Sequence, residues 1–193
     1  LAASNYVMND VQILMTDLMV WEHYTYEEPD QSMPSALTDH AACAMNGMVY
    51  VSGGQTGDAA TPQNVHVYGL DPSTMTWTTV TDLPEARMAH AMVCDPASDT
   101  IYIIGGFGAF DVGGTAYPVD TIWAYDVDGG SWDSTLTAME ATRVRHKAEM
   151  IDANTILVAS GAFDGFMSKR TDLYHIDTDT WEQTGDTIFM RWN

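Results

Sequence analysis

Three histidines stand at similar places in the sequence and are the first candidates for chemistry. They are His40, His90 and His146, and each stands at the start of a predicted strand. Three imidazole rings that met at one point could bind a metal ion. The strands belong to separate sheets in the interpretation below, and the strand ends of neighbouring sheets splay apart. We therefore expect no shared metal ion.

An acidic turn is the other possible ion site. Residues 126–130, Asp-Val-Asp-Gly-Gly, are similar to part of a calcium-binding loop, but they lack a third carboxylate and the distal Glu of such loops. We expect the chain to bind no cofactor, with a calcium ion at this turn as the alternative. The sequence shows no nucleophile with a neighbouring base and no carboxylate pair. No catalytic residue is therefore assigned.

The elements that must position these residues repeat along the chain. Tryptophans recur about every 50 residues, and each follows an aligned Asp and an earlier Tyr or Leu. We expect the Asp side chains to hydrogen-bond within turns and the Trp side chains to pack between repeats. The aligned sets are Trp21, Trp77, Trp132 and Trp181; Asp17, Asp71, Asp128 and Asp177; and Leu14, Tyr68, Tyr125 and Tyr174.

Each full repeat predicts four short antiparallel strands. Asn46-Gly47 between two apolar runs is typical of a tight hairpin, because a type I′ turn needs positive φ at both central residues. The second strand is apolar at consecutive positions, as in Ile101 to Ile104, which indicates burial on both faces. Such sheets must stack on one another. The second strands end in Gly53-Gly54, Gly105-Gly106 and, with one substitution, Ser160-Gly161.

The combined pattern resembles the kelch repeat. In order, it has Arg87, His90, an apolar run that ends in Gly-Gly, a strand with Tyr, and a last strand with Trp before the next Arg. The resemblance covers residues 9–191 and implies an all-β fold, a β-propeller of four-stranded antiparallel kelch blades. Three departures are Ser160-Gly161, the missing Tyr of the first copy, and a connector at 22–39 where an Arg would be expected.

The repeats set the predicted organisation of residues 1–193 as a partial kelch propeller. With strands A to D named from His to Trp, residues 9–21 hold strands C and D of a truncated blade, 22–39 a long connector, and 40–81, 87–142 and 146–185 full blades. This makes about three and a half blades, whereas kelch-like propellers usually close with about six or seven. We expect the chain to be part of a larger ring, whose other blades lie in a longer chain or a neighbouring one.

One face of such a ring would gather the candidate binding residues. The B–C loops and D–A connectors emerge there, and all seven Lys and Arg residues fall on it. Arg87, Arg143 and Arg191 belong to the repeat pattern, and in kelch repeats such residues, like the histidines, commonly brace neighbouring blades. Exposed aromatic residues and Arg are typical interface anchors. The predicted binding set is Arg145, Lys169, Arg170, Phe107, Phe110, Tyr117, Phe163, Phe166, His40, His90 and His146.

The charge of the chain excludes two classes of partner. It has 27 acidic and 7 basic residues, a net charge of −20. Phosphate backbones and anionic lipid are bound by clustered Lys and Arg, and no apolar run approaches the roughly 20 residues that span a bilayer. We expect no nucleic acid and no membrane insertion. The compartment stays open, although an acidic, lysine-poor surface favours an extracellular or cell-surface location over the cytoplasm.

The two cysteines are expected not to be bridged to each other. Cys43 is the third residue after His40, and Cys94 is the fourth after His90. Because side chains alternate along a strand, this spacing places the two on opposite strand faces.

Three functions follow as hypotheses. The first is a protein-binding or scaffold module whose B–C/D–A loop face takes another protein or an acidic peptide. The second is a fragment of a kelch-type carbohydrate oxidase or epimerase, although the Tyr, Cys and His copper ligands of such oxidases match no motif here. The third is a structural component of a larger extracellular or cell-surface assembly. The sequence favours a non-enzymatic function but does not exclude an enzyme.

Overall fold

The computed structural model describes residues 11–15, 20–24, 32–56, 63–163 and 166–186, and all regular structure within them is β-strand. Three four-stranded antiparallel sheets form the body, which confirms the predicted fold class. The first sheet is β4 (Ala41–Met45), β5 (Met48–Ser52), β7 (His66–Asp71) and β8 (Thr76–Asp82). The second is β9 (Ala91–Asp95), β10 (Thr100–Ile104), β11 (Ile122–Asp126) and β12 (Ser131–Asp133). The third is β13 (Lys147–Asp152), β14 (Thr155–Ala159), β17 (Arg170–His175) and β18 (Thr180–Asp186).

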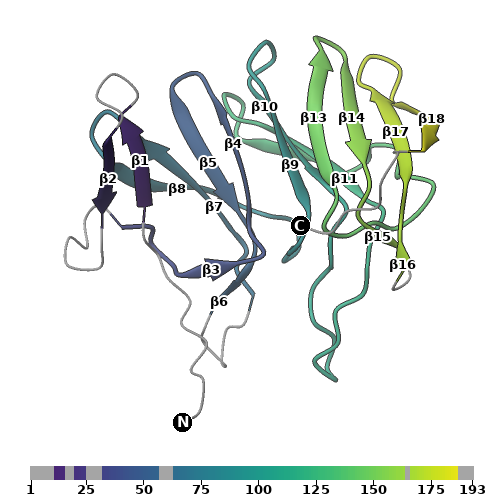
Figure 1. Cartoon of the computed structure of the whole chain (residues 1–193), viewed down its shortest axis with the longest axis horizontal. Coiled ribbons are helices and arrows are strands. Elements are labelled where there is room, and N and C mark those ends of the chain that lie inside the picture. Colours follow the sequence, from purple (N-terminus) through teal and green to yellow (C-terminus); the bar gives the residue numbers. More distant parts are fainter. Residues whose placement is uncertain (1–10, 16–19, 25–31, 57–62, 164–165, 187–193) are drawn as a thin grey trace.

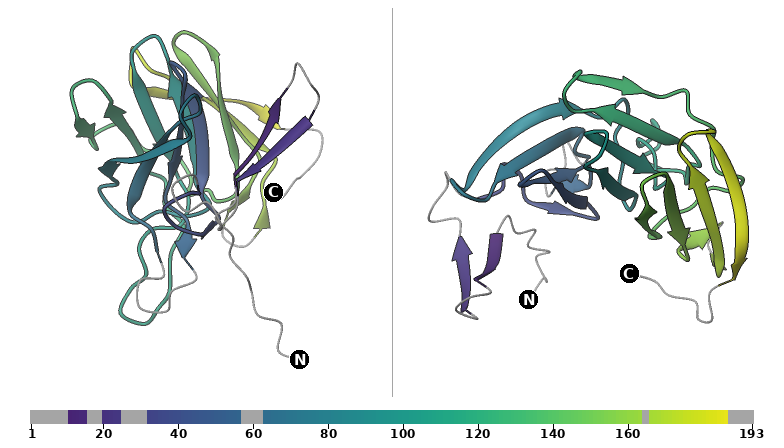
Figure 2. Two further views of the ribbon diagram at one scale, coloured as in Figure 1. Left: turned by 90° about the vertical axis from the view of Figure 1, so that its left-hand side faces the viewer. Right: turned by 90° about the horizontal axis from the view of Figure 1, so that it is seen from above.

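The sheets stand side by side along an open arc (Figure 2). The antiparallel pair β1 (Val11–Met15) and β2 (Val20–Tyr24) lies beyond the first sheet. The first strands of the three sheets are neighbours, since β4 contacts β9 and β9 contacts β13. The described sheets therefore form part of a propeller that is not closed, with the first strands on its inner side.

The Asn46-Gly47 hairpin forms as predicted. Asn46 has a φ of 52° and Gly47 a φ of 80°, and Met45 pairs with Met48 directly across the turn. Both values lie in the left-handed region that this turn requires.

The third and fourth strands differ in register from the sequence alignment. On the neighbouring strand, the residue opposite each Trp is the one seven positions earlier in the sequence. These partners are Leu14, Leu70, Tyr125 and Tyr174. Tyr68 therefore lies two residues from the position predicted for it. The reason is in the turns: the backbone N–H groups of Ser73 and Gly129 donate to Asp71 and Asp126 respectively, at 2.8 Å each. Asp126, not Asp128, is thus the equivalent of Asp71, and Asp17 lies outside the described residues.

The connector at 22–39 is less irregular than predicted. β2 extends to Tyr24, and β3 (Leu37–Thr38) pairs with β6 (Gln55–Thr56). Equivalent bridges join Met88 to Phe107 and Val144 to Ala162 in the next two repeats. A two-residue pairing has no visible periodicity, so the sequence pattern could not predict it.

Backbone hydrogen bonds tie each sheet to the next beside the histidines. The N–H of Ala89 donates to the carbonyl of Asp39, and the N–H of Arg145 donates to that of Ala89, both at 2.8 Å. The glycine pairs allow this close approach. A Cβ added at Gly105 would lie 2.7 Å from the Arg143 carbonyl oxygen, so a larger residue would push neighbouring sheets apart.

Two apolar core clusters lie in the seams between sheets, and a third packs Val51 and Tyr68 of the first sheet against Met33 and Leu37. In the first seam, Tyr50 and Val67 pack with Ile103 and Trp123. In the second, Tyr102 and Ile122 pack with core residues of the third sheet, Ile156, Val158 and Tyr174. The indole N–H of Trp132 donates to the Asp82 carbonyl, and that of Trp181 donates to the Thr137 carbonyl. Trp132 therefore joins the second sheet to the first, and Trp181 joins the third sheet to the second repeat.

Cys43 and Cys94 form a disulfide with their Cα atoms 5.6 Å apart, so the prediction that they are not bridged was wrong. It assumed that opposite strand faces separate the two side chains. In a stack of sheets, however, one face of a sheet meets the opposite face of the next. The third residue after one histidine therefore meets the fourth residue after the following histidine. Val93 and Met150 occupy these two positions in the next seam and pack in one cluster.

No helix suited to crossing a membrane occurs in the part of the chain that the structure describes.

Candidate interaction face and channel cavity

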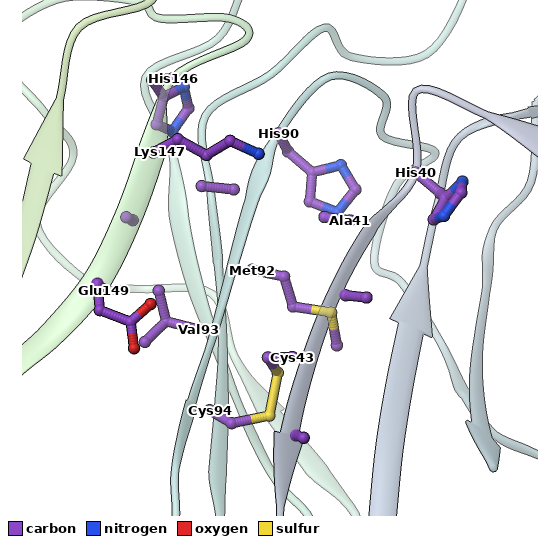
Figure 3. A pocket seen from close by; sticks show the side chains of 14 residues that line it. His40, Ala41, Cys43, His90, Met92, Val93, Cys94, His146, Lys147 and Glu149 are labelled. Carbon is purple, nitrogen blue, oxygen red and sulfur yellow. A yellow bond between two sulfur atoms is a disulfide. The ribbon is translucent and has the colours of Figure 1, made fainter. Parts of the chain in front are cut away.

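The inner side of the arc holds a cavity of about 490 Å³. Its walls are the first strands of the three sheets, and Figure 3 shows their side chains around one space. It is lined by the three histidines, the disulfide, Met92, Lys147 and Glu149, with small residues between them. The cavity is the part of the propeller channel that these three sheets enclose.

The structure brings the three predicted histidines to this cavity but places them differently. His40 is exposed, whereas His90 and His146 are 6% and 2% exposed. The His90 ring nitrogen Nε2 lies 2.8 Å from the Ser52 hydroxyl oxygen. His146 has no hydrogen-bond partner at either ring nitrogen among the described residues. Both buried rings lie against the glycine pair of the preceding sheet, as bracing residues do.

Burial sets the protonation of these two histidines. Loss of solvent, with a smaller contribution from the charge of Arg87, lowers the pKa of His90 to about 3. Burial likewise lowers the pKa of His146 to about 3, with a smaller contribution from Arg143. Both rings are therefore neutral at pH 7. Among the described residues, no group of three His, Cys, Asp or Glu side chains is arranged to hold a metal ion.

Two cavity residues were missed by the sequence reasoning. Lys147 and Glu149 are exposed on β13 and line the cavity, and no ion pair of either occurs among the described residues. The equivalent residues are Ala41 and Cys43 in the first sheet and Ala91 and Val93 in the second. The sequence did contain a signal for these two residues. When the three strands are aligned from their histidines, the third strand has charged residues where the first two have small or apolar ones.

The B–C loops gather on the opposite side of the sheets from the A–B hairpins. Figure 1 shows β6, the long loop between β10 and β11, and the hairpin β15 (Ala162–Phe163) and β16 (Phe166–Met167) along its lower edge. The hairpins β9–β10 and β13–β14 turn at its upper edge. The predicted loop residues thus lie toward one face, although they do not form one cluster.

The loop between β10 and β11 is held by the first sheet. Phe107 bridges to Met88 and Pro118 through its backbone and is half-buried. The N–H of Phe110 donates to Gln63 Oε1 at 2.7 Å, and Gln63 Nε2 donates to the Gly108 carbonyl. Tyr117 is 60% exposed. Of the three predicted aromatic residues here, Tyr117 is thus the most accessible.

Most of the predicted basic residues are already engaged. Arg145 Nη2 lies 3.7 Å from Asp39 Oδ1. Arg170 binds Asp172 at 2.8 Å and also Glu140, and only 23% of its side chain is exposed. These contacts limit what Arg145 and Arg170 can offer to a partner. Arg191 lies outside the described residues.

The two described arginines that belong to the repeat pattern, Arg87 and Arg143, are buried and contact the neighbouring sheet. Arg143 donates to Asp172 at 2.5 Å, with both side chains almost fully buried. Arg87 lies 4.0 Å from the centre of the Trp123 ring, and burial lowers its pKa to about 10, which leaves it charged at pH 7. Trp123 and Asp172 occupy the same register position, opposite Ile103 and Val158. The same arginine position therefore uses an aromatic ring in one sheet and a carboxylate in the next.

An apolar groove that includes Lys169 lies beside β16. It has a volume of about 460 Å³ and includes Phe166, Met167, Lys169 and Arg170 in its walls. Phe166 is 76% and Met167 43% exposed. Lys169 makes no side-chain ion pair among the described residues. Phe163 pairs with Phe166 through the backbone, and its side chain is not among those described.

The sheets, the inner histidines, the glycine pairs and the clamping tryptophans agree with comparison to known proteins. A family model, the KLHDC2/KLHL20/DRC7 Kelch-repeats domain, matches residues 2–188. The chain belongs to the kelch-repeat family.

Relatives of this kelch chain are longer proteins. Kelch domain-containing protein 10 of Rattus norvegicus is 34% identical over 110 residues, which are 54% of this chain and 25% of that protein. Putative protein tag-53 of Caenorhabditis elegans is 24% identical over 178 residues, 84% of this chain and 13% of that protein. The chain thus spans about a quarter or less of the length of these curated relatives.

A solved structure supports the fold. The structure of YjhT superposes with a TM-score of 0.77 at 17% identity, covering 96% of this chain and 64% of that one. At this identity the likeness concerns the fold alone.

Proposed function

We propose that this kelch chain is a protein-interaction module that binds its partner through the groove beside β16. The observation that carries the proposal is the exposure of Phe166 and Met167 next to Lys169. Large apolar side chains in a concave site are typical anchors of interfaces, while a charge at the rim gives orientation. The family supports an interaction role, because kelch repeats are a common scaffold for protein binding.

The charge of the groove defines the partner. With a net charge of −20 on the chain and the described arginines buried or paired, a strongly acidic peptide would be repelled over most of this surface. In this groove Lys169 has no ion-pair partner among the described residues, and Asp186 lies elsewhere in the groove wall. The partner that fits is a peptide segment with an apolar anchor residue and one acidic residue beside it.

The test is selection of binding peptides from a displayed library on the intact chain. We expect selected peptides to share an apolar residue next to an acidic one. Phe166→Ser should weaken their binding by about 30-fold, the usual effect of losing an anchor, and Lys169→Glu should weaken it several-fold in a salt-dependent way. Neither change should alter the melting temperature by much, because both side chains lie outside the core.

Ile151→Ser is the matched control. Ile151 is 51% exposed at the A–B end of β13, on the other side of the sheets. It should leave peptide binding unchanged. Equal losses from Ile151→Ser and Phe166→Ser, or peptides without a shared anchor, would contradict the proposal.

The channel cavity favours a second candidate, part of a carbohydrate-acting enzyme. Its volume lies in the usual range for small-ligand sites, and Lys147 and Glu149 provide a cation and a carboxylate on one wall. A glycan array and metal analysis of the chain test it, and two blank results would remove this candidate.

A further inference from the structure

The disulfide lies on the wall of the channel cavity. Cys43 and Cys94 both line the cavity and are both half-buried, and Figure 3 shows their bridge among the lining side chains. The bridge joins β4 to β9, so it crosses the seam between the first two sheets at their inner strands. A sulfur–sulfur bond at this place can be approached from the cavity without opening the core.

The next seam has no equivalent bond. Val93 and Met150 stand in the two matching positions and make apolar contacts within one cluster instead of a covalent bond. The first seam also has its own apolar core, together with the Ser52–His90 and Asn46–Asp99 contacts. The geometry of the fold thus does not require a covalent bond here.

We propose that the Cys43–Cys94 bridge is a thiol–disulfide exchange site that reacts with small neutral or cationic thiols entering the channel cavity. In the first step a thiolate attacks one cysteine sulfur, forms a mixed disulfide with it, and releases the other cysteine as a thiolate. A second small thiolate attacks the mixed disulfide at the small thiol's sulfur. Both cysteines are then reduced, and the two small thiols leave as one disulfide.

The charge around the bridge selects the thiol. Glu149 is the third residue after His146, as Cys43 is the third after His40, so the carboxylate and the bridge lie at one level of the cavity. Lys147 lies two residues nearer the histidine end. The carboxylate, in a chain of net charge −20, repels an approaching anionic thiolate such as that of glutathione. Cysteamine carries an ammonium group that offsets this repulsion.

The sheets remain joined after reduction. Backbone bonds from Ala89 to Asp39 and from Gly54 to Arg87 cross the same seam, as does the Trp132 contact with Asp82. We expect the reduced chain to keep its β-sheet circular dichroism and to melt at a lower temperature, because the unfolded chain regains the freedom that the bridge removes.

The test is the rate of reaction of the oxidised chain with cysteamine, 2-mercaptoethanol and glutathione, each compared per thiolate at low salt. Mass spectrometry of trapped mixed disulfides identifies the cysteine attacked. We expect the order cysteamine, 2-mercaptoethanol, glutathione, and rates that do not change when urea is added below the unfolding transition. Rates that rise with urea in step with unfolding, or a bridge that resists all three thiols in the folded chain, would overturn the proposal.

Two variants test separately the effect of the Glu149 charge and the effect of the Cys43–Cys94 bond. Glu149→Gln should speed the glutathione reaction by about two- to threefold at low salt. It should speed the 2-mercaptoethanol reaction by less, because that thiolate carries a smaller negative charge; an equal effect on both thiols would contradict the selection by charge. Cys43→Val with Cys94→Met copies the residues of the next seam and should show no melting shift with thiol. If this double variant does not fold, the urea dependence of the natural chain still decides.

Discussion

His90 and His146 show how one residue type acts differently at equivalent positions. Both are buried against a neighbouring sheet, while His40 at the same place in the first sheet is exposed. A buried histidine must stay neutral, because the folded chain cannot solvate its charge. Folding therefore opposes protonation at two of the three sites.

This burial predicts a loss of stability in mild acid. The pKa of each buried ring is about 3 in the folded chain and about 6.5 when unfolded, so the unfolded state binds more protons between these values. The free energy of unfolding should therefore begin to fall as the pH drops through about 6.5, by about 2 kcal/mol for each histidine between pH 7 and pH 5. Urea unfolding at several pH values measures it.

His146→Leu should remove about half of this pH dependence. Its matched control is His40→Asn, which changes the exposed histidine and should leave the dependence as it is. A His146→Leu variant with the full pH dependence of the natural chain would contradict the assignment.

At the scale of the element, the second seam contains an ion pair with both partners buried, whereas in the pair that the equivalent Arg87 makes the carboxylate of Glu85 is half-exposed. Arg143 lies in the connector between the second and third sheets and binds Asp172 on β17, and it also donates to the carbonyl of Val158. Burial lowers the pKa of Arg143, and the Asp172 charge offsets part of that effect. Arg170 contacts the same carboxylate.

Removing one partner of this pair should cost more than removing both. We expect Arg143→Met to lower the free energy of unfolding by about 3 kcal/mol, because it leaves Asp172 buried with only Arg170 beside it. Adding Asp172→Leu should recover part of that loss. Urea titrations of the two single variants and the double variant measure the coupling.

Arg87→Met is the control in the first seam. Arg87 lies over Trp123, and its carboxylate partner Glu85 is half-exposed. Loss of Arg87 therefore leaves no buried anion unpaired and should cost less. Additive losses for the Arg143 and Asp172 changes would show that the pair does not act as a unit.

At the scale of the whole molecule, charge opposes an apolar face of the third sheet on which no other described sheet packs. Ile156, Val158 and Tyr174 face the second sheet, so Leu157 and Leu173, which pair across β14 and β17, face away from it. An uncovered apolar face favours association. The net charge of −20 opposes it.

This balance predicts association of the chain controlled by salt. The chain should sediment as a monomer near 10 mM salt and associate near 1 M, where the screening length falls from about 30 to about 3 Å. Sedimentation velocity at the two salt concentrations measures this. Leu157→Glu places a charge on the uncovered face and should stay monomeric at both; one sedimentation coefficient for the natural chain at all salt concentrations would contradict the prediction.

The sequence by itself determined the repeating architecture. Evenly spaced tryptophans, glycine pairs and the Asn46-Gly47 turn are local signals, because each reports a backbone or packing requirement within one repeat. They were enough to predict four-stranded antiparallel sheets and the kelch family. They also predicted that the basic and aromatic loop residues emerge toward one face.

Only the tertiary structure decided what happens between repeats. The disulfide was mispredicted because its two cysteines belong to different sheets, and alternation within a strand does not say which faces meet. The same limit applies to Arg170, whose partner Glu140 comes from a connector thirty residues away, and to Lys147 and Glu149, whose cavity exists only where three strands meet. Seams and cavities are made by the stacking of sheets, so their contacts depend on residues that are distant in the sequence.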